Sequence, residues 1–116
     1  MTFDEFAHHC RQLKGHTEEI LWEDHLVFKV GGKMFAVMGD AAAGNVSIKV
    51  DPVLFHDLTQ VPGVIPAPYL ARAHWVQIQL GTCGFSDSQI QELAHASYAL
   101  VVQKLSKKIQ RSLQAS

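Results

Sequence analysis

The sequence predicts an α+β fold in which helices at both ends of the chain pack on one mostly antiparallel β-sheet. Apolar residues recur at helical spacing near both ends, they alternate along several short segments in between, and a Gly-Gly pair joins two of those segments at hairpin spacing. The expected element order is α-β-β-β-β-α-β-α. A chain of 116 residues is expected to form a single domain, residues 1–116.

The first helix is expected over about residues 3–14. Thr2 and Glu5 form a capping box, in which each side chain binds a free backbone amide of the first helical turn. Gly15 supplies a stop signal after the last apolar position. The apolar residues that recur at helical spacing are Phe3, Phe6, Ala7, Cys10 and Leu13.

The segments that follow this helix and are expected to be strands are EEILWE, HLVFKV, KMFAVMG and NVSIKV. Gly31-Gly32 separates the second segment from the third by a two-residue turn, which pairs Val30 with Lys33. The pairs expected on one face are then Phe28 with Phe35 and Leu26 with Val37. The other face is expected to carry Lys29, Met34, Ala36 and Met38.

The second half of the chain predicts a short helix, a strand and a long helix. Asp51-Pro52 opens the short helix, because Asp caps a helix and Pro fits its first position. The segment VPGVIPAPYLARA holds three of the four prolines and is expected to be an ordered loop or broken turn. HWVQIQL is a strand. Ser86 and Gln89 form a second capping box, and the helix that they open is expected to run to about residue 112.

Charge and cysteine content narrow the class of protein. The net charge of −1 argues against a strong polyanion binder, but seven acids stand against four bases through Asp40, and four bases and no acids follow Glu92. Cys10 and Cys83 lie far apart and are expected to stay reduced. No signal peptide and no apolar stretch of about 20 residues is present, so a cytoplasmic monomer without a membrane partner is expected.

The glycines do not predict a nucleotide site. Gly39 and Gly44 have the spacing of a phosphate loop, but Asn45-Val46 stands where such a loop needs Lys-Ser or Lys-Thr. A strand follows, whereas a phosphate loop leads into a helix. Gly31-Gly32-Lys33 likewise leads straight into a strand. Both glycine pairs are therefore interpreted as turns.

The sequence contains few patterns that would indicate a metal site or a catalytic site. The seven histidines include no pair at i, i+4 spacing and no H-E-x-x-H motif, so no metal or cofactor is expected, although a site assembled only in space remains open. Cys10 lies on an apolar helical stripe, where a thiol is buried and inert. Glu18 and Glu19 fall on opposite faces of a strand, which is poor geometry for acid–base catalysis. The protein is therefore expected not to be an enzyme, with Cys83 and His74 as the residues to test.

Clusters of basic residues predict contact with DNA. On one continuous helix, the positions i, i+3, i+4 and i+7 would form a basic face from Lys104, Lys107, Lys108 and Arg111. Phosphate contacts release counterions, so such binding would depend on salt. A second patch could gather Arg72, His74 and Trp75 with Lys29, Lys33 and Lys49. The competing interpretations are a solvated helix end and, for Trp75, packing between sheet and helix.

Three blocks of sequence resemble the MmcQ/YjbR family of small bacterial proteins over about residues 3–105. They are ILWEDHLVFKVGGKMFAV, PYLARAHWVQIQL and LAHASYALVVQKL. The resemblance implies a CyaY-like α+β fold and a label of DNA binding. The family's middle block reads Asn-Lys-x-His-Trp; here His74-Trp75 match, Arg72 replaces the lysine and Ala71 stands at the asparagine position. Residues 106–116 extend beyond the shared core as a basic helical tail.

The favoured hypothesis is a non-enzymatic family member that binds DNA weakly and in a salt-sensitive way. The candidate contacts are Lys33, Lys49, Arg72, His74, Trp75, Lys104, Lys107, Lys108 and Arg111. The alternative is a protein-binding or small-ligand-binding domain that uses the exposed face of the sheet or the Pro-rich loop.

Overall fold

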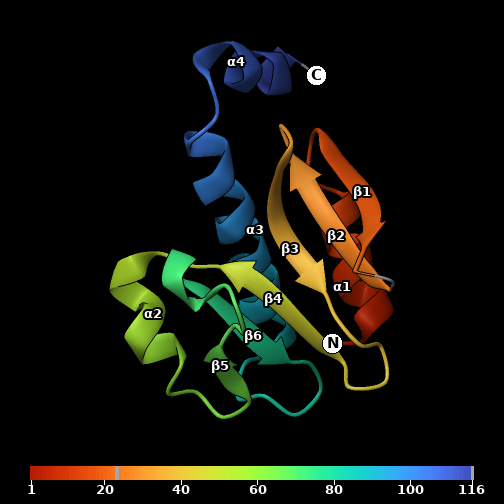
Figure 1. Ribbon diagram of the computed structural model, residues 1–116, viewed down its shortest axis with the longest axis vertical. Coiled ribbons are helices and arrows are strands. Elements are labelled where there is room, and N and C mark those ends of the chain that lie inside the picture. Colours follow the sequence, from red (N-terminus) through yellow and green to blue (C-terminus); the bar gives the residue numbers. More distant parts are fainter. Residues whose placement is uncertain (23, 116) are drawn as a thin grey trace.

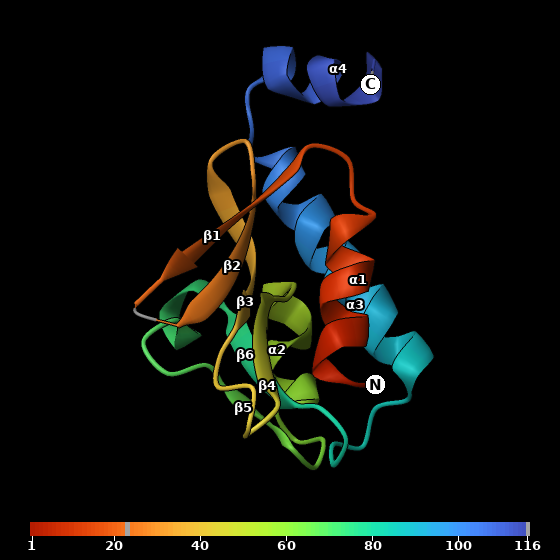
Figure 2. The same ribbon diagram turned by 90° about the vertical axis from the view of Figure 1, so that its right-hand side faces the viewer.

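The structure is a computed structural model that describes residues 1–22 and 24–115. Its strands are β1 (His16–Leu21), β2 (His25–Val30), β3 (Lys33–Met38), β4 (Asn45–Lys49), β5 (Val64–Pro66) and β6 (Trp75–Gln79). Its helices are α1 (Phe3–Arg11), α2 (Pro52–Leu58), α3 (Asp87–Gln103) and α4 (Lys107–Ala115), with a 3₁₀ turn at Ala71–Ala73. The strands form one antiparallel sheet in the order β1-β2-β3-β4-β6-β5, and α1 and α3 cover one of its faces (Figures 1 and 2). The predicted α+β class is confirmed.

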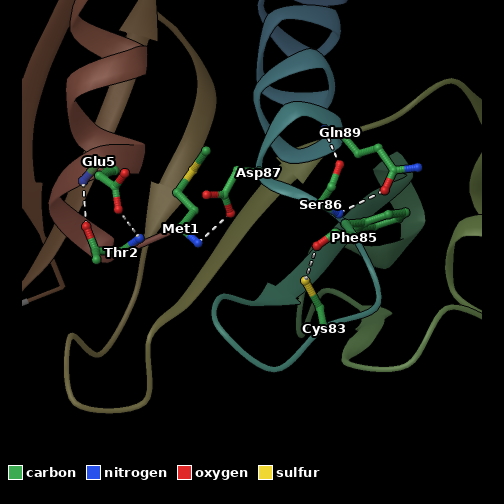
Figure 3. A network of polar contacts seen from close by, with 8 residues as sticks. All are labelled: Met1, Thr2, Glu5, Cys83, Phe85, Ser86, Asp87 and Gln89. Carbon is green, nitrogen blue, oxygen red and sulfur yellow. Dashed lines mark hydrogen bonds and ion pairs between the residues drawn. The ribbon is translucent and has the colours of Figure 1, made fainter.

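Both long helices begin at the predicted capping boxes. Thr2 Oγ1 accepts a hydrogen bond from the amide of Glu5 at 3.1 Å, and the Glu5 carboxylate accepts one from the amide of Thr2 at 2.9 Å. The second box makes the same exchange at the start of α3 (Figure 3). The ammonium group of Met1 donates to the Asp87 carboxylate at 2.6 Å, which raises the pKa of that ammonium and joins the starts of the two helices.

The hairpin between β2 and β3 turns at the predicted glycines. Val30 pairs with Lys33, as expected, and Gly31 and Gly32 have φ angles of 57° and 79°, which glycine adopts at little cost. The turn also packs against the end of α3, because a Cβ atom on Gly31 would lie 2.7 Å from the Leu105 side chain. Any larger residue at Gly31 would therefore strain both the backbone and this contact.

A β-bulge changes the register beyond that turn. The pairing shifts between Phe28 and Lys29, so that Phe28 lies opposite Ala36. The pairs Phe28–Phe35 and Leu26–Val37 predicted from the sequence are wrong. One extra residue in β3 moves every later side chain to the other face, so Ala36 and Met38 join the core under the helices and Val37 faces the open side. The rings of Phe28 and Phe35 still pack together, with centroids 6.1 Å apart.

Ser97 of α3 attaches the helix to the bulged strand. Its side chain is fully buried, its hydroxyl donates to the carbonyl of Phe35 at 2.6 Å, and it accepts from the amide of Lys49 at 3.0 Å. The hydroxyl thus satisfies one backbone group of β3 at the bulge and one of β4.

The two faces of the sheet carry separate cores. The face under α1 and α3 holds the larger one, whose fully buried members include Phe6, Phe28, Phe35, Ile48, Ile78 and Ile90. The open face holds a small cluster of Val27, Val37, Ala67 and Trp75. Trp75 therefore packs between the sheet and the connection after β5, and the predicted packing between sheet and helix is wrong.

The Pro-rich segment contains a strand that the sequence did not predict. β5 pairs with β6 at the edge of the sheet, and its last residue is Pro66. Proline lacks the N–H group that a central strand would need, but an edge strand tolerates it. A 3₁₀ turn at Ala71–Ala73 then leads into β6.

The long C-terminal helix expected to about residue 112 is two helices. α3 ends at Gln103, and α4 starts anew at Lys107 after the hydroxyl of Ser106 accepts a hydrogen bond from the amide of Ile109 at 3.3 Å. The first helix also ends early, at Arg11. Glu23, the last residue of the EEILWE segment, lies outside the described residues. Within the described chain, none of the helices has the length and apolar character needed to span a bilayer.

Candidate functional site

The open face of the sheet carries a row of side chains that crosses five strands. Residues paired directly across a sheet point to the same face, and their Cβ atoms lie about 4.5–5.5 Å apart. The row consists of Val27, Val37, Ser47, Gln77 and Ile65. It begins as an apolar surface and becomes polar at Ser47 and Gln77, in the middle of the sheet.

A pocket of about 620 Å³ opens over this row. Val37, Ser47 and Gln77 belong to both the row and the pocket lining, so they form its floor. Trp22, beside the β1–β2 turn, and Pro68–Leu70, after β5, contribute from opposite edges of the sheet. In Figure 2 both connections project on the side away from α1 and α3. The pocket is therefore built where no helix covers the sheet.

Two exposed aromatic side chains flank the pocket. The exposed fraction is 59% for Trp22 and 104% for Tyr69, and both residues have left-handed backbones, with φ of 49° and 66°. This conformation costs a residue other than glycine roughly 1–2 kcal/mol. The ring of Tyr69 gains no burial in return, so the fold itself gives no reason for an aromatic residue there. Strained residues of this kind concentrate at functional sites.

The polar side chains of the pocket have unused hydrogen-bonding capacity. The hydroxyl of Ser47 and the carboxamides of Asn45 and Gln77 make no hydrogen bond to protein atoms anywhere in residues 1–22 and 24–115. Each of them can donate and accept a hydrogen bond. The pocket can therefore bind neutral polar groups in its floor.

The charge around the pocket is acidic or neutral. Its lining contains no lysine or arginine. The carboxylate of Asp40 lies in the lining and accepts a hydrogen bond from the amide of Ala42 at 2.9 Å. His25 also lies in the lining, and its Nδ1 atom is 3.1 Å from the carboxylate of Asp24. An anionic ligand would find no cationic lysine or arginine partner in this pocket.

The described residues offer little for catalysis. No base lies within hydrogen-bonding distance of the Ser47 hydroxyl. Across residues 1–22 and 24–115, no three His, Cys, Asp or Glu side chains are close enough to hold a metal ion together. Cys10 is fully buried, as expected, and burial raises the pKa of its thiol to about 12. Cys83 is half-buried and reduced, beside the carbonyl of Phe85 (Figure 3).

The bases predicted to contact DNA are largely without acidic partners. Seven of them form no ion pair with a carboxylate of the described residues. These seven, which we call the basic end, are Lys33, Lys49, Arg72, Lys104, Lys107, Lys108 and Arg111. By contrast, Lys29 is bound to Glu19, and the register places Lys29 and Lys33 on opposite faces of the sheet, as expected.

Contacts bring the basic end together in part. The ammonium of Lys49 donates to the carbonyl of Ala73, next to Arg72, at 2.8 Å. Burial, and then repulsion from nearby Lys104, lowers the pKa of Lys49. The predicted single helical stripe is wrong, because Lys104 caps α3 while Lys107, Lys108 and Arg111 lie on α4. In Figure 1, α4 lies at one end of the molecule, beyond the β2–β3 turn.

The aromatic part of the predicted DNA surface is turned inward. Trp75 is 5% exposed, and the ring of His74 packs edge-on against Phe55 with centroids 5.6 Å apart. Neither ring is placed to stack on a base. The exposed aromatic residues are Trp22 and Tyr69, which the sequence interpretation did not assign to a site. The sequence did contain one signal, Tyr69 in the Pro-rich segment. An aromatic residue in a segment expected to be a loop has no expected role in packing a helix or strand.

The structure is that of a small α+β domain with a pocket on the open face of its sheet. The chain belongs to the YjbR family, whose model matches residues 11–100. The predicted resemblance to the MmcQ/YjbR family is thereby confirmed.

The solved structures that are similar to this chain include the following two. The crystal structure of the Deinococcus radiodurans protein DR2400, with the family-model domain DUF419, has 29% identity and a TM-score of 0.85, covering 97% of this chain and 88% of that one. A Pseudomonas syringae protein has 23% identity and a TM-score of 0.75, covering 87% of this chain and 99% of that one, and at this identity shows the fold alone. No curated protein matches the chain.

Proposed function

We propose that the protein is a non-enzymatic binding domain that holds a small ligand in the pocket on the open face of its sheet. One observation carries this function: Trp22 and Tyr69 flank the pocket with exposed aromatic rings. Both residues have a strained, left-handed backbone, and packing of the Tyr69 ring does not offset that strain. The volume of about 620 Å³ falls within the range of roughly 300–1,000 Å³ usual for ligand pockets. This is the alternative that the sequence left open, with the sheet face and the Pro-rich loop acting together.

Fragment binding followed by ¹⁵N NMR tests this function. The probes are indole, benzamide, glucose and guanidinium, which sample flat rings, amides, sugars and cations. We expect at least one probe to shift the backbone amides of the floor and of Leu70, in a saturable way. The shifts should weaken in Trp22→Gly and Tyr69→Gly, which remove the rings and relax the left-handed backbones.

The control for these variants is Val53→Ala, on α2, where the side chain is 83% exposed and lies outside the pocket lining. It should leave the fragment shifts unchanged. If none of the four probes moves the amides of the lining, the proposed pocket function is wrong.

A second function, weak DNA binding, is supported by a different observation: the seven cations of the basic end lack carboxylate partners within the described chain. We propose that this end contacts phosphates without stacking on bases. Anisotropy of a labelled DNA duplex, measured from low to physiological salt, tests the idea. Changing Lys107, Lys108 and Arg111 together to glutamine should reduce the salt slope by about 2–3, because each phosphate contact contributes about 0.9.

The matched control for the DNA experiment is Lys29→Gln, since Lys29 is already bound to Glu19. It should leave the slope unchanged. An absence of binding at low salt, where electrostatic affinity is greatest, would contradict the DNA function and leave the pocket function untouched.

A further inference from the structure

The pocket offers flat apolar surfaces at its edges. Trp22 and Tyr69 expose their rings, and Pro68 and Leu70 add apolar surface beside Tyr69. Aromatic faces bind planar rings by stacking, and this is how proteins hold unpaired bases. A flexible alkyl chain would cover such faces less completely than a flat ring.

The floor of the pocket offers neutral donors and acceptors close together. Ser47 and Gln77 are directly paired on adjacent strands, so their side chains can reach the same edge of one ligand. A carboxamide presents a donor and an acceptor side by side, the pattern with which Asn and Gln recognise base edges. The carboxamide of Asn45, two residues before Ser47 on β4, adds a second such group. An amide-like edge on the ligand would complement this floor.

Charge further restricts the ligand. Asp40 lies in the lining, Asp24 lies beside His25, and lysine and arginine are missing from the lining. Lys29, which shares the open face, is held by Glu19. The acidic side chains here would repel a phosphate or carboxylate group, whereas they would not repel an uncharged ligand.

We infer that the pocket selects a planar, uncharged nitrogen heterocycle with an amide-like edge, namely a free nucleobase or nucleoside without phosphate. The inference rests on the pocket function proposed above and names its ligand class. The ring stacks on the aromatic side chains that line the pocket, and its edge exchanges hydrogen bonds with Ser47 and Gln77. The open mouth of the pocket accommodates the ribose.

Tryptophan fluorescence provides the test. The chain has two tryptophans, and Trp75 is buried while Trp22 is exposed, so quenching by a stacked ring reports on Trp22. The probes are adenosine, guanosine, cytidine and uridine, their 5′-monophosphates, and indole as a flat ring without an amide edge. We expect saturable quenching by at least one nucleoside. Its monophosphate should bind about fivefold more weakly at low salt.

Two variants separate the contributions of edge and ring. Ser47→Ala combined with Gln77→Leu should weaken nucleoside binding roughly tenfold and leave indole binding unchanged. Tyr69→Gly should weaken both by roughly tenfold, since the ligand ring loses an aromatic surface on which to stack. Circular dichroism checks that each variant remains folded.

Three results would overturn the inference. Binding of indole without binding of any nucleoside would contradict the ligand class and leave the pocket function standing. Monophosphates that bind as tightly as their nucleosides would contradict the charge argument. A single-stranded tetranucleotide that binds more tightly than the nucleosides, and is sensitive to Tyr69→Gly, would assign the pocket to an unpaired base of a strand.

Discussion

The two faces of the sheet use the same types of side chain in opposite ways. Under the helices, Ser97 is fully buried and both of its hydrogen bonds are made to the backbone. On the open face, Ser47 is half-buried and makes no hydrogen bond within the described residues. Aromatic residues differ likewise: Phe28 and Phe35 are enclosed, whereas Trp22 and Tyr69 face solvent. One face is occupied in stabilising the fold, and the other retains the hydrogen-bonding and stacking groups that a ligand could use.

The largest change in the free energy of unfolding is expected when Ser97, the serine on the covered face, is replaced by alanine. Ser97→Ala leaves the buried carbonyl of Phe35 and the part-buried amide of Lys49 without their side-chain partner. We expect a loss of about 2–4 kcal/mol in the free energy of unfolding, measured by urea denaturation. Ser47→Ala, the matched change on the open face, should cost less than about 0.5 kcal/mol. Equal losses of stability in the two variants would contradict the conclusion that the covered face stabilises the fold and the open face does not.

Local signals in the sequence were sufficient for the elements that depend on neighbours along the chain. Both capping boxes and the Gly31-Gly32 turn act within four residues, and each was placed correctly. The bulge in β3 was missed because alternation assumes one-to-one pairing, and the Phe35 carbonyl is satisfied by Ser97, far away in sequence. The break before α4 was missed because the helical spacing of the basic residues continues past Gln103 and Ser106 was not recognised as a cap.

Apart from Tyr69, the candidate pocket could not be predicted from local signals, for a different reason. Trp22, Ser47, Tyr69 and Gln77 come from four separate segments, and the strand order brings them together. None of these residues forms a ligand-binding motif with its sequence neighbours. The basic end, in contrast, could be predicted in part, because four of its cations lie close together in sequence after Glu92. Even there, the break between α3 and α4 divides the predicted face.

A smaller change in stability, and one that stabilises the protein, is expected from replacing Tyr69 on the open face by glycine. Tyr69→Gly removes a fully exposed ring and relaxes a backbone with φ of 66°. We expect the free energy of unfolding to rise by about 0.5–1 kcal/mol, measured by urea denaturation, while ligand binding falls. Tyr69→Ala is the control, because it removes the ring but keeps the strained conformation, and it should not stabilise the protein. A loss of stability in the glycine variant would mean that the ring supports the fold.

The smallest changes in the free energy of unfolding are expected at two neighbouring glutamates, Glu18 and Glu19. Their side chains lie on opposite faces of the sheet, as the sequence predicted. On the covered side, Arg11 donates two hydrogen bonds of 2.8 Å to Glu18 and lies over the Phe28 ring. On the open side, Glu19 is bound to Lys29. Glu18→Gln should lower the free energy of unfolding by up to about 1 kcal/mol at neutral pH, and Glu19→Gln by less, because a bidentate pair is better fixed than a single contact.

Acid titration distinguishes the Glu18 pair from a packing effect. The hydrogen bonds from Arg11 lower the pKa of Glu18 in the folded chain below its ordinary value of 4.5. The contribution of the pair is therefore complete above that value and disappears as the pH falls through the folded pKa. Urea denaturation at neutral and acidic pH should show the wild type and Glu18→Gln converging in acid. If their difference persists there unchanged, the negative charge of Glu18 is not its cause, and the proposed contribution of the ion pair is wrong.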